Sequence, residues 1–329
     1  MDTDPVTTEE SVFGLRTLVV RQVRLEATSV VSLQLVDPDG GALPRWQPGA
    51  HLDLMLPSGL IRQYSLCGDP EDTHSYTVAV LREARGRGGS AEIHDTALVG
   101  RGLEIRGPRN HFALTRAEGY VFLAGGIGIT PILAMIRTAA VRGLPWQLYY
   151  GGRDLAHMAF RQELLALGAD RVHLLPQDTH GLPDFTAILN GQPADCLVYA
   201  CGPEGMLRAA EEACSRAAQR RDFRAERFAV ATKAAPEPTD RGTFTVVLKR
   251  SGIQLTVPPD RSLLEVVREA LPDTPYSCEE GYCGTCETRV IDGVPEHNDQ
   301  ILSPEERARN RTMMICVGRS RTPELTLDL

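Results

Sequence analysis

Residues 278–286 read CEEGYCGTC, and a fourth cysteine follows far along the chain at Cys316. Three cysteines in one tight loop plus one from a distant segment are the ligand set of a plant-type [2Fe–2S] cluster, in which each iron takes two thiolates. Gly281 and Gly284 lie between the ligands, where small residues let backbone N–H groups approach the sulfurs and tune the reduction potential. The spacing therefore predicts a centre that moves one electron at a time. Its expected ligands are Cys278, Cys283, Cys286 and Cys316.

Two other uses of these cysteines fit the sequence less well. A zinc site usually pairs two C-x2-C knuckles, and only one such pair stands here, inside the three-cysteine loop. Disulfides need an oxidising compartment, but the first residues, MDTDPVTTEES, are polar and acidic, with no apolar core of a signal peptide. No apolar run approaches the length of a membrane span. We expect a soluble, cytoplasmic protein, in which Cys67, Cys196 and Cys214 are ordinary buried thiols.

Length and charge narrow the function further. A chain of 329 residues predicts two to three domains, each with its own core. The formal net charge of −8 argues against a nucleic acid as partner, because phosphate binding needs clustered Lys and Arg. This charge fits a protein whose partners are other proteins.

The sequence pattern changes three times along the chain. Residues 1–113 alternate short segments rich in Val, Leu, Ile and Thr with turn clusters, and predict an antiparallel β-barrel with a helix near 90–98. Residues 114–230 alternate strand and helix patterns, and predict a parallel sheet with helices on its faces. Residues 231–242, ATKAAPEPTDRG, lack apolar periodicity and read as an extended linker. Residues 243–329 hold the four spaced cysteines.

Two glycine-containing turns mark the parallel sheet. LAGGIGITP at residues 123–131 follows a predicted strand and opens a helix, so its glycines allow a pyrophosphate to approach the helix N-terminus. Pro131 suits the first helical turn. YACGPEGM at 199–206 also joins a strand end to a helix, and two such turns at one sheet edge frame a cleft. Taken alone, either string also fits a simple turn.

Two further strings lie in the predicted barrel. RQYS at residues 62–65 places an arginine, a tyrosine and a serine on one strand, where they can hold a phosphate and contact a planar ring. A surface arginine and a half-buried tyrosine explain this string equally simply. GRGGS at residues 86–90 precedes the helix-like segment and is able to cradle a phosphate, although a flexible loop has the same composition.

The order of these strings is more specific than any one of them. R-x-Y-S, G-R-G-G-S, G-G-I-G-I-T-P, C-G-P and C-x4-C-x2-C…C follow one another as in the phthalate dioxygenase reductase family, a branch of the ferredoxin–NADP reductase superfamily, which the chain resembles from about residue 15 to its end. Shared stretches include YSLCGD at 64–69 and RSLLEV at 261–266. The resemblance implies a flavin-binding barrel (1–113), a nucleotide-binding α/β domain (114–230) and a β-grasp ferredoxin domain (243–329).

The resemblance also implies a set of cofactor contacts. The barrel would bind FMN rather than FAD, because the ferredoxin domain lies at the C-terminus. Ser65 would steady the flavin N5 edge, Cys201 would lie near the nicotinamide, and Phe228 would stack on the flavin ring. The remaining flavin contacts implied are Arg62, Tyr64, Ala79, Val80, Gly86, Gly88, Gly89, Ser90 and Glu226. The nucleotide contacts implied are Gly125, Gly126, Gly128, Thr130, Pro131, Arg153, Asp154, Gly202, Pro203 and Met206, with Thr130 also within reach of the flavin.

One departure from the family concerns the choice of nucleotide. Relatives selective for NADPH often carry a hydroxyl residue before the arginine that corresponds to Arg153, and here Gly152 stands in that place. Asp154 would repel a 2′-phosphate and accept from ribose hydroxyls, whereas Arg153 alone favours a phosphate. On balance the sequence favours NADH.

These expectations combine into one electron path. NADH would deliver a hydride to FMN, and single electrons would leave through the cluster to a separate oxygenase, which is a Rieske non-haem iron component by resemblance. A bacterial cytochrome P450 is the alternative acceptor, and a redox-sensing regulatory protein is a rival of another class. Glu279 and Glu280 beside the cluster loop are candidates for a docking face, or ordinary solvated charges. A monomer is expected by analogy.

Overall fold

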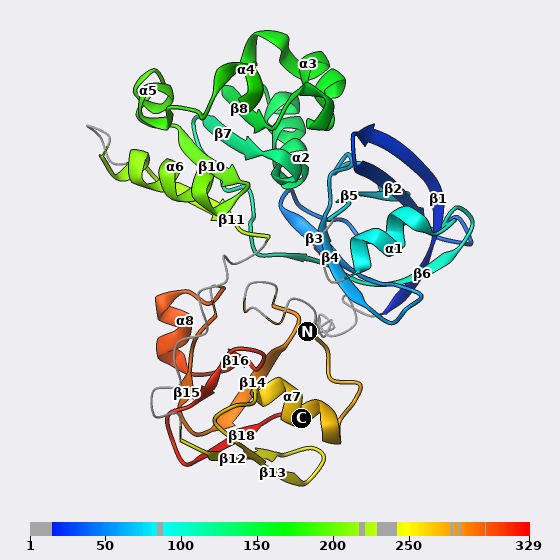
Figure 1. The fold of residues 1–329 in the computed structure, drawn as a ribbon, viewed down its shortest axis with the longest axis vertical. Helices are drawn as coiled ribbons and strands as arrows, with labels where there is room; N and C mark the ends of the chain where they lie inside the picture. Colours follow the sequence, from blue (N-terminus) through cyan, green and yellow to red (C-terminus); the bar gives the residue numbers. More distant parts are fainter. Residues whose placement is uncertain are drawn as a thin grey trace, which may run out of the picture. The chain divides into compact units, whose positions relative to one another are not determined.

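The computed structural model describes residues 15–83, 88–216, 221–228, 242–276, 279, 281, 284–299 and 301–329. The chain divides into two compact units, Met1–Phe228 and Ala229–Leu329 (Figure 1). Each unit has hydrophobic cores of its own.

Six antiparallel strands form the first half of the larger unit. Their order in the sheet is β4-β3-β6-β1-β2-β5, and an isolated bridge between Leu66 and Val78 connects the two outer strands. Because the edges meet, the sheet closes into a barrel, as predicted. Alternate side chains such as Leu33, Leu35 and Leu52 fill its interior and are fully buried. The bounds are β1 Arg16–Ala27, β2 Val30–Val36, β3 Ala50–Met55, β4 Ile61–Ser65, β5 Ser75–Leu81 and β6 Gly102–Asn110, with helix α1 at Gly89–Asp95.

A parallel sheet forms the second half of this unit. Its order is β11-β10-β7-β8-β9, and every residue of the central strand β7 is buried because helices cover both faces. The strands are β7 Tyr120–Gly125, β8 Trp146–Gly152, β9 Val172–Pro176, β10 Leu197–Cys201 and β11 Phe223–Glu226. The α-helices are α2 Ile129–Val141, α3 Arg161–Gly168, α4 Gln177–His180, α5 Phe185–Asn190 and α6 Glu204–Arg216. Short 3-10 turns are η2 Gly126–Gly128, η3 Leu155–His157 and η4 Ala169–Arg171.

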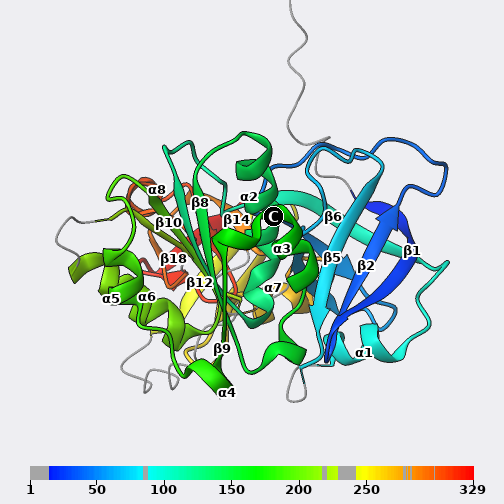
Figure 2. The ribbon, with the colours of Figure 1, turned by 90° about the horizontal axis from the view of Figure 1, so that it is seen from above.

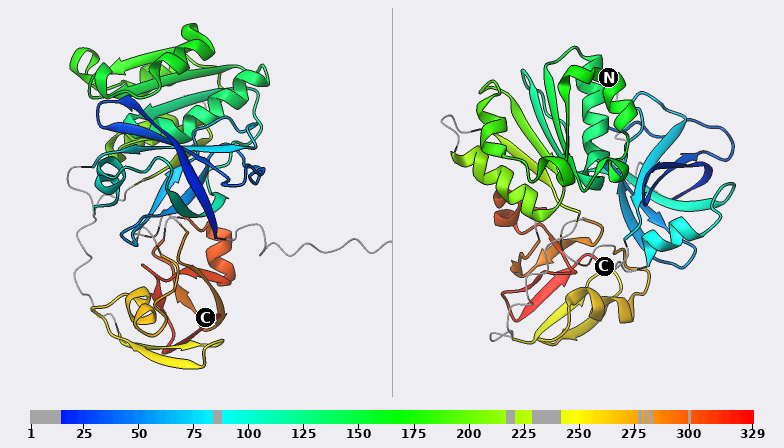
Figure 3. Two further views of the ribbon diagram at one scale, coloured as in Figure 1. Left: turned by 90° about the vertical axis from the view of Figure 1, so that its right-hand side faces the viewer. Right: turned by 45° about the horizontal axis from the view of Figure 1, so that its top comes forward.

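Helix α2 lies between the parallel sheet and the barrel (Figure 2, and the right-hand view of Figure 3). Nine of its thirteen residues are buried, which is more than a helix with one covered face can bury. Ala134 belongs to the barrel core, whereas Leu133 and Ile136 belong to a core that joins residues of both halves. The barrel and the sheet are therefore packed through one shared helix.

The smaller unit is a mixed sheet with two helices (yellow to red in Figure 1). Its strand order is β13-β12-β18-β14-β16, with β12 and β18 parallel and the other pairs antiparallel. This arrangement is the β-grasp ferredoxin domain that was predicted. The bounds are β12 Phe244–Leu248, β13 Ile253–Val257, β14 Glu287–Asp292, β16 Thr312–Met314 and β18 Glu324–Leu327, with a separate pair β15 Pro295–Glu296 and β17 Arg319–Ser320.

Both helices of the smaller unit begin at a capping box. Ser262 caps α7 (Leu263–Ala270) with Glu265, and Ser303 caps α8 (Pro304–Arg309) with Glu306. Helix α7 turns its apolar side toward the core of this unit, where Leu263 and Val267 are fully buried. In the described parts of the chain, no helix has the length and apolarity that crossing a bilayer requires.

Candidate functional site

A pocket of about 640 Å³ opens at the carboxyl ends of the parallel strands β7 and β8. Such edges are where open α/β sheets bind ligands. Five of the predicted nucleotide contacts line it, namely Gly125, Gly126, Arg153, Pro203 and Met206. Val30 and Leu81 of the barrel complete its wall, so the pocket reaches the junction between the two halves of the larger unit.

The glycines of this pocket allow two turns to approach each other closely. A Cβ atom on Gly128 would lie 2.2 Å from the carbonyl oxygen of Cys201, and a Cβ on Gly125 would lie 2.6 Å from the sulfur of Met206. Only residues without side chains fit at these positions. The two sequence strings at 123–131 and 199–206 therefore form one cradle, whose glycine backbone suits a dinucleotide.

Other predicted nucleotide contacts lie behind the pocket wall. Thr130 is buried, and its hydroxyl donates to the carbonyl of Ile127 at 3.0 Å, inside the turn. Pro131 is buried in the first turn of α2, and Cys201 is fully buried at the end of β10. Gly128, Thr130, Pro131, Cys201 and Gly202 thus shape the cradle from beneath its surface rather than lining the pocket.

Asp154 has a local structural partner that the sequence reading did not include. Its carboxylate caps the short turn η3, accepting from the backbone N–H of His157 at 3.1 Å, and it contacts Nδ1 of His157 at 2.8 Å. These hydrogen bonds hold the pKa of Asp154 below its ordinary value. Arg153 and His157 line the pocket, whereas Asp154 does not. Its predicted contact with the ribose remains a prediction.

The two phosphate strings of the barrel meet in space. A Cβ on Gly89 would lie 2.6 Å from Nε of Arg62, so this arginine rests directly on the glycine backbone at the start of α1. Gly88 has a φ of +86°, which favours glycine. The hydroxyl of Ser90 accepts from the N–H of Glu83 at 3.0 Å. Arg62 beside exposed glycine backbone fits a phosphate, while Gly86 lies outside the described residues.

Tyr64, Ala79 and Val80, which are predicted to contact the flavin ring, lie on β4 and β5. Burial raises the pKa of the Tyr64 hydroxyl, so the phenol stays protonated. Ala79 and Val80 are buried strand residues opposite Ser32 and Val31. The carbonyl of Val80 lies 3.0 Å from Nε2 of His94, at hydrogen-bond distance. One of the backbone groups that were predicted to face the flavin therefore already has a partner in the protein.

Three predicted residues converge where the barrel meets the sheet. The Ser65 hydroxyl donates a hydrogen bond to the carboxyl of Glu226, and this bond by itself lowers the pKa of Glu226. Burial outweighs it and raises the pKa to about 8. Its Oε2 atom is inaccessible to solvent and has no hydrogen-bond partner among the described residues. Cys201 pairs with Glu226 across β10 and β11. Burial, and then the nearby Glu226 charge, raise the pKa of its thiol.

An unpaired carboxyl oxygen at this position fits the edge of a bound ring. A buried oxygen without a partner is costly unless a ligand supplies one. Phe228, two residues further on, packs against the core shared by both halves. Ser65, Cys201 and Glu226 therefore lie close together, although they come from three separate stretches of sequence.

A group of buried polar residues beside Ser65 was missed by the sequence reading. His51 faces Ser65 across β3 and β4, and Asp53 on the same face forms an ion pair with Arg109 of β6. Burial, followed by the charges of Arg109 and His111, lowers the pKa of His51 to about 3. The imidazole is therefore neutral. The only signal in the sequence is a histidine and an aspartate two apart in an apolar strand.

Two of the four predicted cluster ligands can be placed. Cys286 and Cys316 are buried in one core of the smaller unit, and the N–H of Ile315 donates to the carbonyl of Cys286 at 3.4 Å, so the two ligand segments adjoin. Gly281 has a φ of +75°, and a Cβ there would lie 2.6 Å from Val317. Cys278, Cys283 and Glu280 lie outside the described residues, and Glu279 is exposed.

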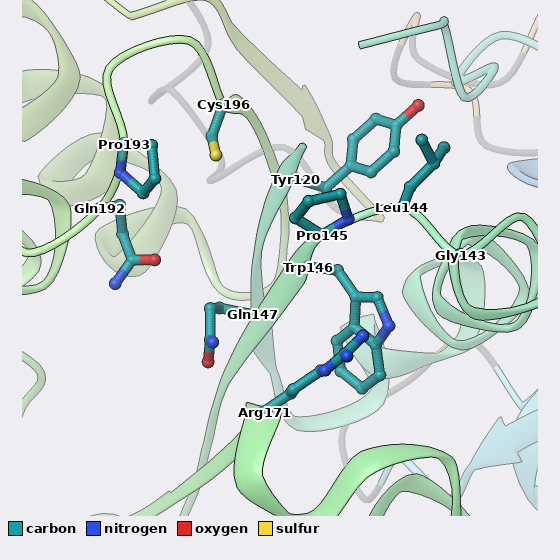
Figure 4. A pocket seen from close by; sticks show the side chains of 10 residues that line it. All are labelled: Tyr120, Gly143, Leu144, Pro145, Trp146, Gln147, Arg171, Gln192, Pro193 and Cys196. Atoms are coloured by element: carbon teal, nitrogen blue, oxygen red, sulfur yellow. The ribbon is translucent and has the colours of Figure 1, made fainter. Parts of the chain in front are cut away.

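A second pocket of about 340 Å³ lies at the opposite end of the parallel sheet (Figure 4). Trp146, which begins β8, and the guanidinium of Arg171, 5.6 Å from the ring centroid, form one side of it. Gln147, Gln192 and Cys196 form the other side. None of the predicted cofactor contacts lies there, and the pocket faces the amino ends of the strands, away from the Gly-rich cradle.

Two domain families match the chain. The 2Fe-2S iron-sulfur cluster binding domain matches residues 246–320, and the oxidoreductase NAD-binding domain matches residues 122–212. The chain is 42% identical to phenoxybenzoate dioxygenase subunit beta of Ectopseudomonas oleovorans, over 95% of this chain and 97% of that protein. It is 37% identical to phthalate dioxygenase reductase of Burkholderia cepacia, over 92% of this chain and 94% of that protein.

Solved structures agree with these sequence matches. A phthalate dioxygenase reductase, described as a modular structure for electron transfer from pyridine nucleotides to [2Fe–2S], is 35% identical with a TM-score of 0.69 and covers 96% of this chain and 98% of its own. An intact type IV self-sufficient cytochrome P450 monooxygenase is 39% identical with a TM-score of 0.85. The match covers 96% of this chain but 41% of the P450 chain, so this chain spans about two-fifths of that protein.

Proposed function

Because the chain belongs to the phthalate dioxygenase reductase family, we propose that it takes electrons from NADH through a bound FMN to a [2Fe–2S] cluster and delivers them singly to a separate oxygenase component. The chain is an oxidoreductase of electron transfer, with an NAD-binding domain and a 2Fe-2S domain. The remaining steps are a proposal that rests on the arrangement of its own residues.

The observation that carries the proposal is the convergence of Ser65 and Glu226. Ser65 ends the strand that bears the R-x-Y-S string, and Glu226 ends the strand beside the C-G-P turn. In this proposal, a ring held by the barrel and a nicotinamide held by the sheet would meet near this hydrogen bond. When bound, FMN supplies the chemistry that accepts a hydride and releases electrons one at a time. The protein binds and orients both partners and excludes water.

Each residue near this junction has a definite part in the proposal. Arg62 and the backbone of Gly88 and Gly89 would hold the FMN phosphate, and Tyr64 and Phe228 would border the ring. Ser65 would donate to the ring edge when it is not bonded to Glu226. Glu226, whose pKa is raised to about 8, would carry a proton at neutral pH and so be able to donate from its unpaired oxygen.

The lining of the pocket at Gly151 and Gly152 supports NADH as the donor. Gly152 and Gly151 present backbone alone there, and the described residues of the wall include one arginine, Arg153. Relatives of the NADPH type, by the resemblance above, add a hydroxyl at the position of Gly152. We infer a preference for NADH, with Arg153 and His157 beside the ribose hydroxyls.

The acceptor is proposed from the names of the relatives. Two further relatives are a toluene-4-sulfonate monooxygenase system reductase subunit of Comamonas testosteroni and a phthalate 4,5-dioxygenase oxygenase reductase subunit of Pseudomonas putida, at 42% and 37% identity. An oxygenase component, of the Rieske non-haem iron kind, is therefore our first candidate. The match to a self-sufficient P450 supports a cytochrome P450 as the second.

An anaerobic spectrum before and after the addition of NADH tests the donor half of this proposal. We expect flavin bands together with sulfur-to-iron absorption, and both should bleach with NADH. If both are present and neither NADH nor NADPH bleaches them, the electron path is wrong and a regulatory role that reads the cluster gains support.

A substitution at one cluster ligand tests the order of the path. Cys286→Ser should abolish reduction of cytochrome c while NADH–ferricyanide turnover persists, because ferricyanide takes electrons from the flavin. Cys214→Ser is the matched control, since Cys214 is a buried thiol of α6 outside the cluster segments. Equal loss of both activities in Cys286→Ser contradicts a flavin-then-cluster route.

A further inference from the structure

Arg137 of helix α2 connects three separate parts of the larger unit. Its guanidinium donates to the backbone carbonyls of Cys67 and Gly68 in the barrel and to the carboxylate of Glu163 on α3. Its side chain is only 18% exposed. Helix α2 is the same helix whose first turn follows the Gly-rich cradle of the nucleotide pocket.

The two carbonyls that Arg137 binds lie just beyond strand β4. This strand carries Arg62, Tyr64 and Ser65, and Leu66 separates its last residue from Cys67 and Gly68. Regular strand pairing stops at the bridge between Leu66 and Val78, so the carbonyls beyond it need donors from elsewhere. The N–H of Cys67 still donates to Thr77 at 2.8 Å, which fixes this segment against β5 and leaves its carbonyls facing α2.

The chemistry of the arginine suits this position and that of a lysine does not. A guanidinium presents five N–H donors in a rigid planar fork, so it can serve two carbonyls and a carboxylate in one fixed geometry. Glu163 balances the charge that burial would otherwise make costly. An ammonium group on a flexible stem has no such fork.

Directional contacts matter here because the packing around α2 is otherwise apolar, whereas the bond between Ser65 and Glu226 joins the barrel to β11 rather than to α2. Val30, Cys67, Ala79 and Phe112 of the barrel side pack against the core around α2. Apolar packing is non-directional and allows small sliding. Another polar link, from the N–H of Thr28 to the carbonyl of Ala156 at 2.8 Å, joins the turn between β1 and β2 to η3 and does not involve β4.

We propose that Arg137 is a positioning residue for hydride transfer, which fixes the strand that holds the flavin relative to the helix that holds the nucleotide. This inference rests on the proposed function. Bound FMN would supply the acceptor for the hydride, so that the C4–H bond of the reduced nicotinamide would break and both its electrons would leave with the hydrogen to the flavin, which gives NAD⁺ and reduced flavin. Arg137 does not line the nucleotide pocket and would act through the backbone of Cys67 and Gly68.

Stopped-flow reduction of the flavin by NADH under anaerobic conditions tests the proposal. Since a misplacement of about 1 Å can cost on the order of 100-fold in rate, Arg137→Ala should lower the limiting rate of flavin reduction by roughly 10- to 100-fold. The NADH concentration that gives half of that limit should stay within about twofold, because the pocket lining is intact. Arg137→Lys should recover part of the rate at most.

Two variants serve as controls for this experiment. Arg142→Ala removes an exposed arginine at the end of the same helix, and its limiting rate should equal that of the wild type. Glu163→Gln keeps the two carbonyl hydrogen bonds of Arg137 and removes only the balancing charge, so its rate should fall less than that of Arg137→Ala. A wild-type limiting rate in folded Arg137→Ala would overturn the proposal, as would an equal loss in Arg142→Ala.

Labelling of Cys67 gives a second measurement that needs no activity. Cys67 is 1% exposed at the junction, and Arg137 acts to lower the pKa of its thiol, which burial raises to about 12. Removing Arg137 therefore makes the reactive thiolate rarer, and the chemistry alone predicts slower modification by N-ethylmaleimide. Faster modification of Cys67 in Arg137→Ala with unchanged modification of Cys214, read by peptide mass spectrometry, would therefore indicate a loosened junction. Cys214, buried in the sheet core away from it, is the internal reference.

The outcomes separate this inference from the proposed function. If NADH fails to reduce the flavin in the wild type, the proposed function fails, whatever Cys67 shows. If the wild type is reduced and Arg137→Ala labels Cys67 no faster than the wild type, the positioning role fails while the proposed function stands. Faster labelling of Cys67 and Cys214 together, with a lower unfolding temperature, would make Arg137 a stability residue and also overturn the proposal.

Discussion

The hydroxyl of Ser65 donates to the carboxyl of Glu226, and this bond links the barrel to the outer edge of the parallel sheet. Ser65 is 6% exposed, and Oε2 of Glu226 is inaccessible and unpaired among the described residues. The carboxyl therefore has one oxygen engaged by the protein and one available to a ligand. Its raised pKa makes it a proton carrier near neutral pH.

Glu226→Gln should change how stability depends on pH. Burial raises the pKa of Glu226 from its ordinary 4.5 to about 8, so between these values the folded chain holds a proton that the unfolded chain releases. The stability of the wild type should therefore fall as pH rises through this window, by on the order of 1 kcal/mol per pH unit at most. The glutamine variant lacks this proton and should become more stable than the wild type toward pH 9.

Urea unfolding of both proteins in the cofactor-free state, from pH 5 to pH 9, measures this difference directly. Glutamine keeps the shape of the side chain and an acceptor for Ser65, so the comparison isolates the charge. The same slope of unfolding free energy against pH in both proteins would show that Glu226 titrates normally.

Gly89→Ala should weaken FMN binding without harming the fold. The new methyl would lie 2.6 Å from Nε and 2.7 Å from Cγ of Arg62, so the arginine must swing away from the start of α1. Alanine is otherwise a better helix residue than glycine. Loss of one charged hydrogen bond to a phosphate costs about 1.5–3 kcal/mol, or roughly 10- to 100-fold in the dissociation constant of FMN.

Flavin fluorescence quenching by the cofactor-free protein gives this constant. Gly191→Ala is the matched control, because a Cβ there meets its nearest neighbour at an ordinary 3.5 Å. An unchanged FMN constant in Gly89→Ala would remove Arg62 from the phosphate site.

Gly152→Ser alone should not convert the protein to NADPH. A Cβ on Gly152 would lie 2.4 Å from Cγ of Met158, which is 1% exposed and cannot move aside freely. Overpacking of this kind costs about 1–3 kcal/mol of stability. We expect a less stable variant with lower NADH use and little gain with NADPH.

The double variant Gly152→Ser/Met158→Ala removes the clash and lets the hydroxyl reach the ribose side of the pocket. Met158→Ala alone is the control. The ratio of kcat/KM with NADPH to kcat/KM with NADH should be about tenfold higher in the double variant than in this control, because one good hydrogen bond contributes about that factor. A tenfold rise of the same ratio in Gly152→Ser alone, with unchanged stability, would mean that Met158 does not exclude a side chain at position 152.

Much of the fold and the site could be predicted because the signals are local. The cysteine spacing, the two glycine turns and R-x-Y-S each occupy a few consecutive residues, and each fixes a backbone shape or a charge that its chemistry needs. Strand β6, at Gly102–Asn110, gave no such signal, because GLEIRGPRN contains charges, two glycines and a proline. It becomes a strand through pairing with β1 on one side and β3 on the other.

Residues whose role depends on distant segments were out of reach. No role was predicted for Arg137 from the sequence, because only the packing of α2 against the barrel brings it to Cys67 and Gly68. The contact of Arg62 with Gly89 is likewise tertiary. Asp154 is different, since an aspartate three residues before His157 is a local capping signal that could have been recognised.

The shared position of α2 has a consequence for protein engineering. Reductases of this kind invite recombination, in which the flavin half of one relative is joined to the nucleotide half of another. The seam at residues 111–119 is a natural crossover point between β6 and β7. A crossover there, however, takes Cys67 and Gly68 from one parent and Arg137 and Glu163 from the other. Unless both parents carry the same contacts, a chimera will keep both coenzyme sites but lose the hydrogen bonds of Arg137 that connect the two halves. Parents for recombination should therefore be chosen first for identical residues at these Arg137 contacts, and only then for similar coenzyme pockets.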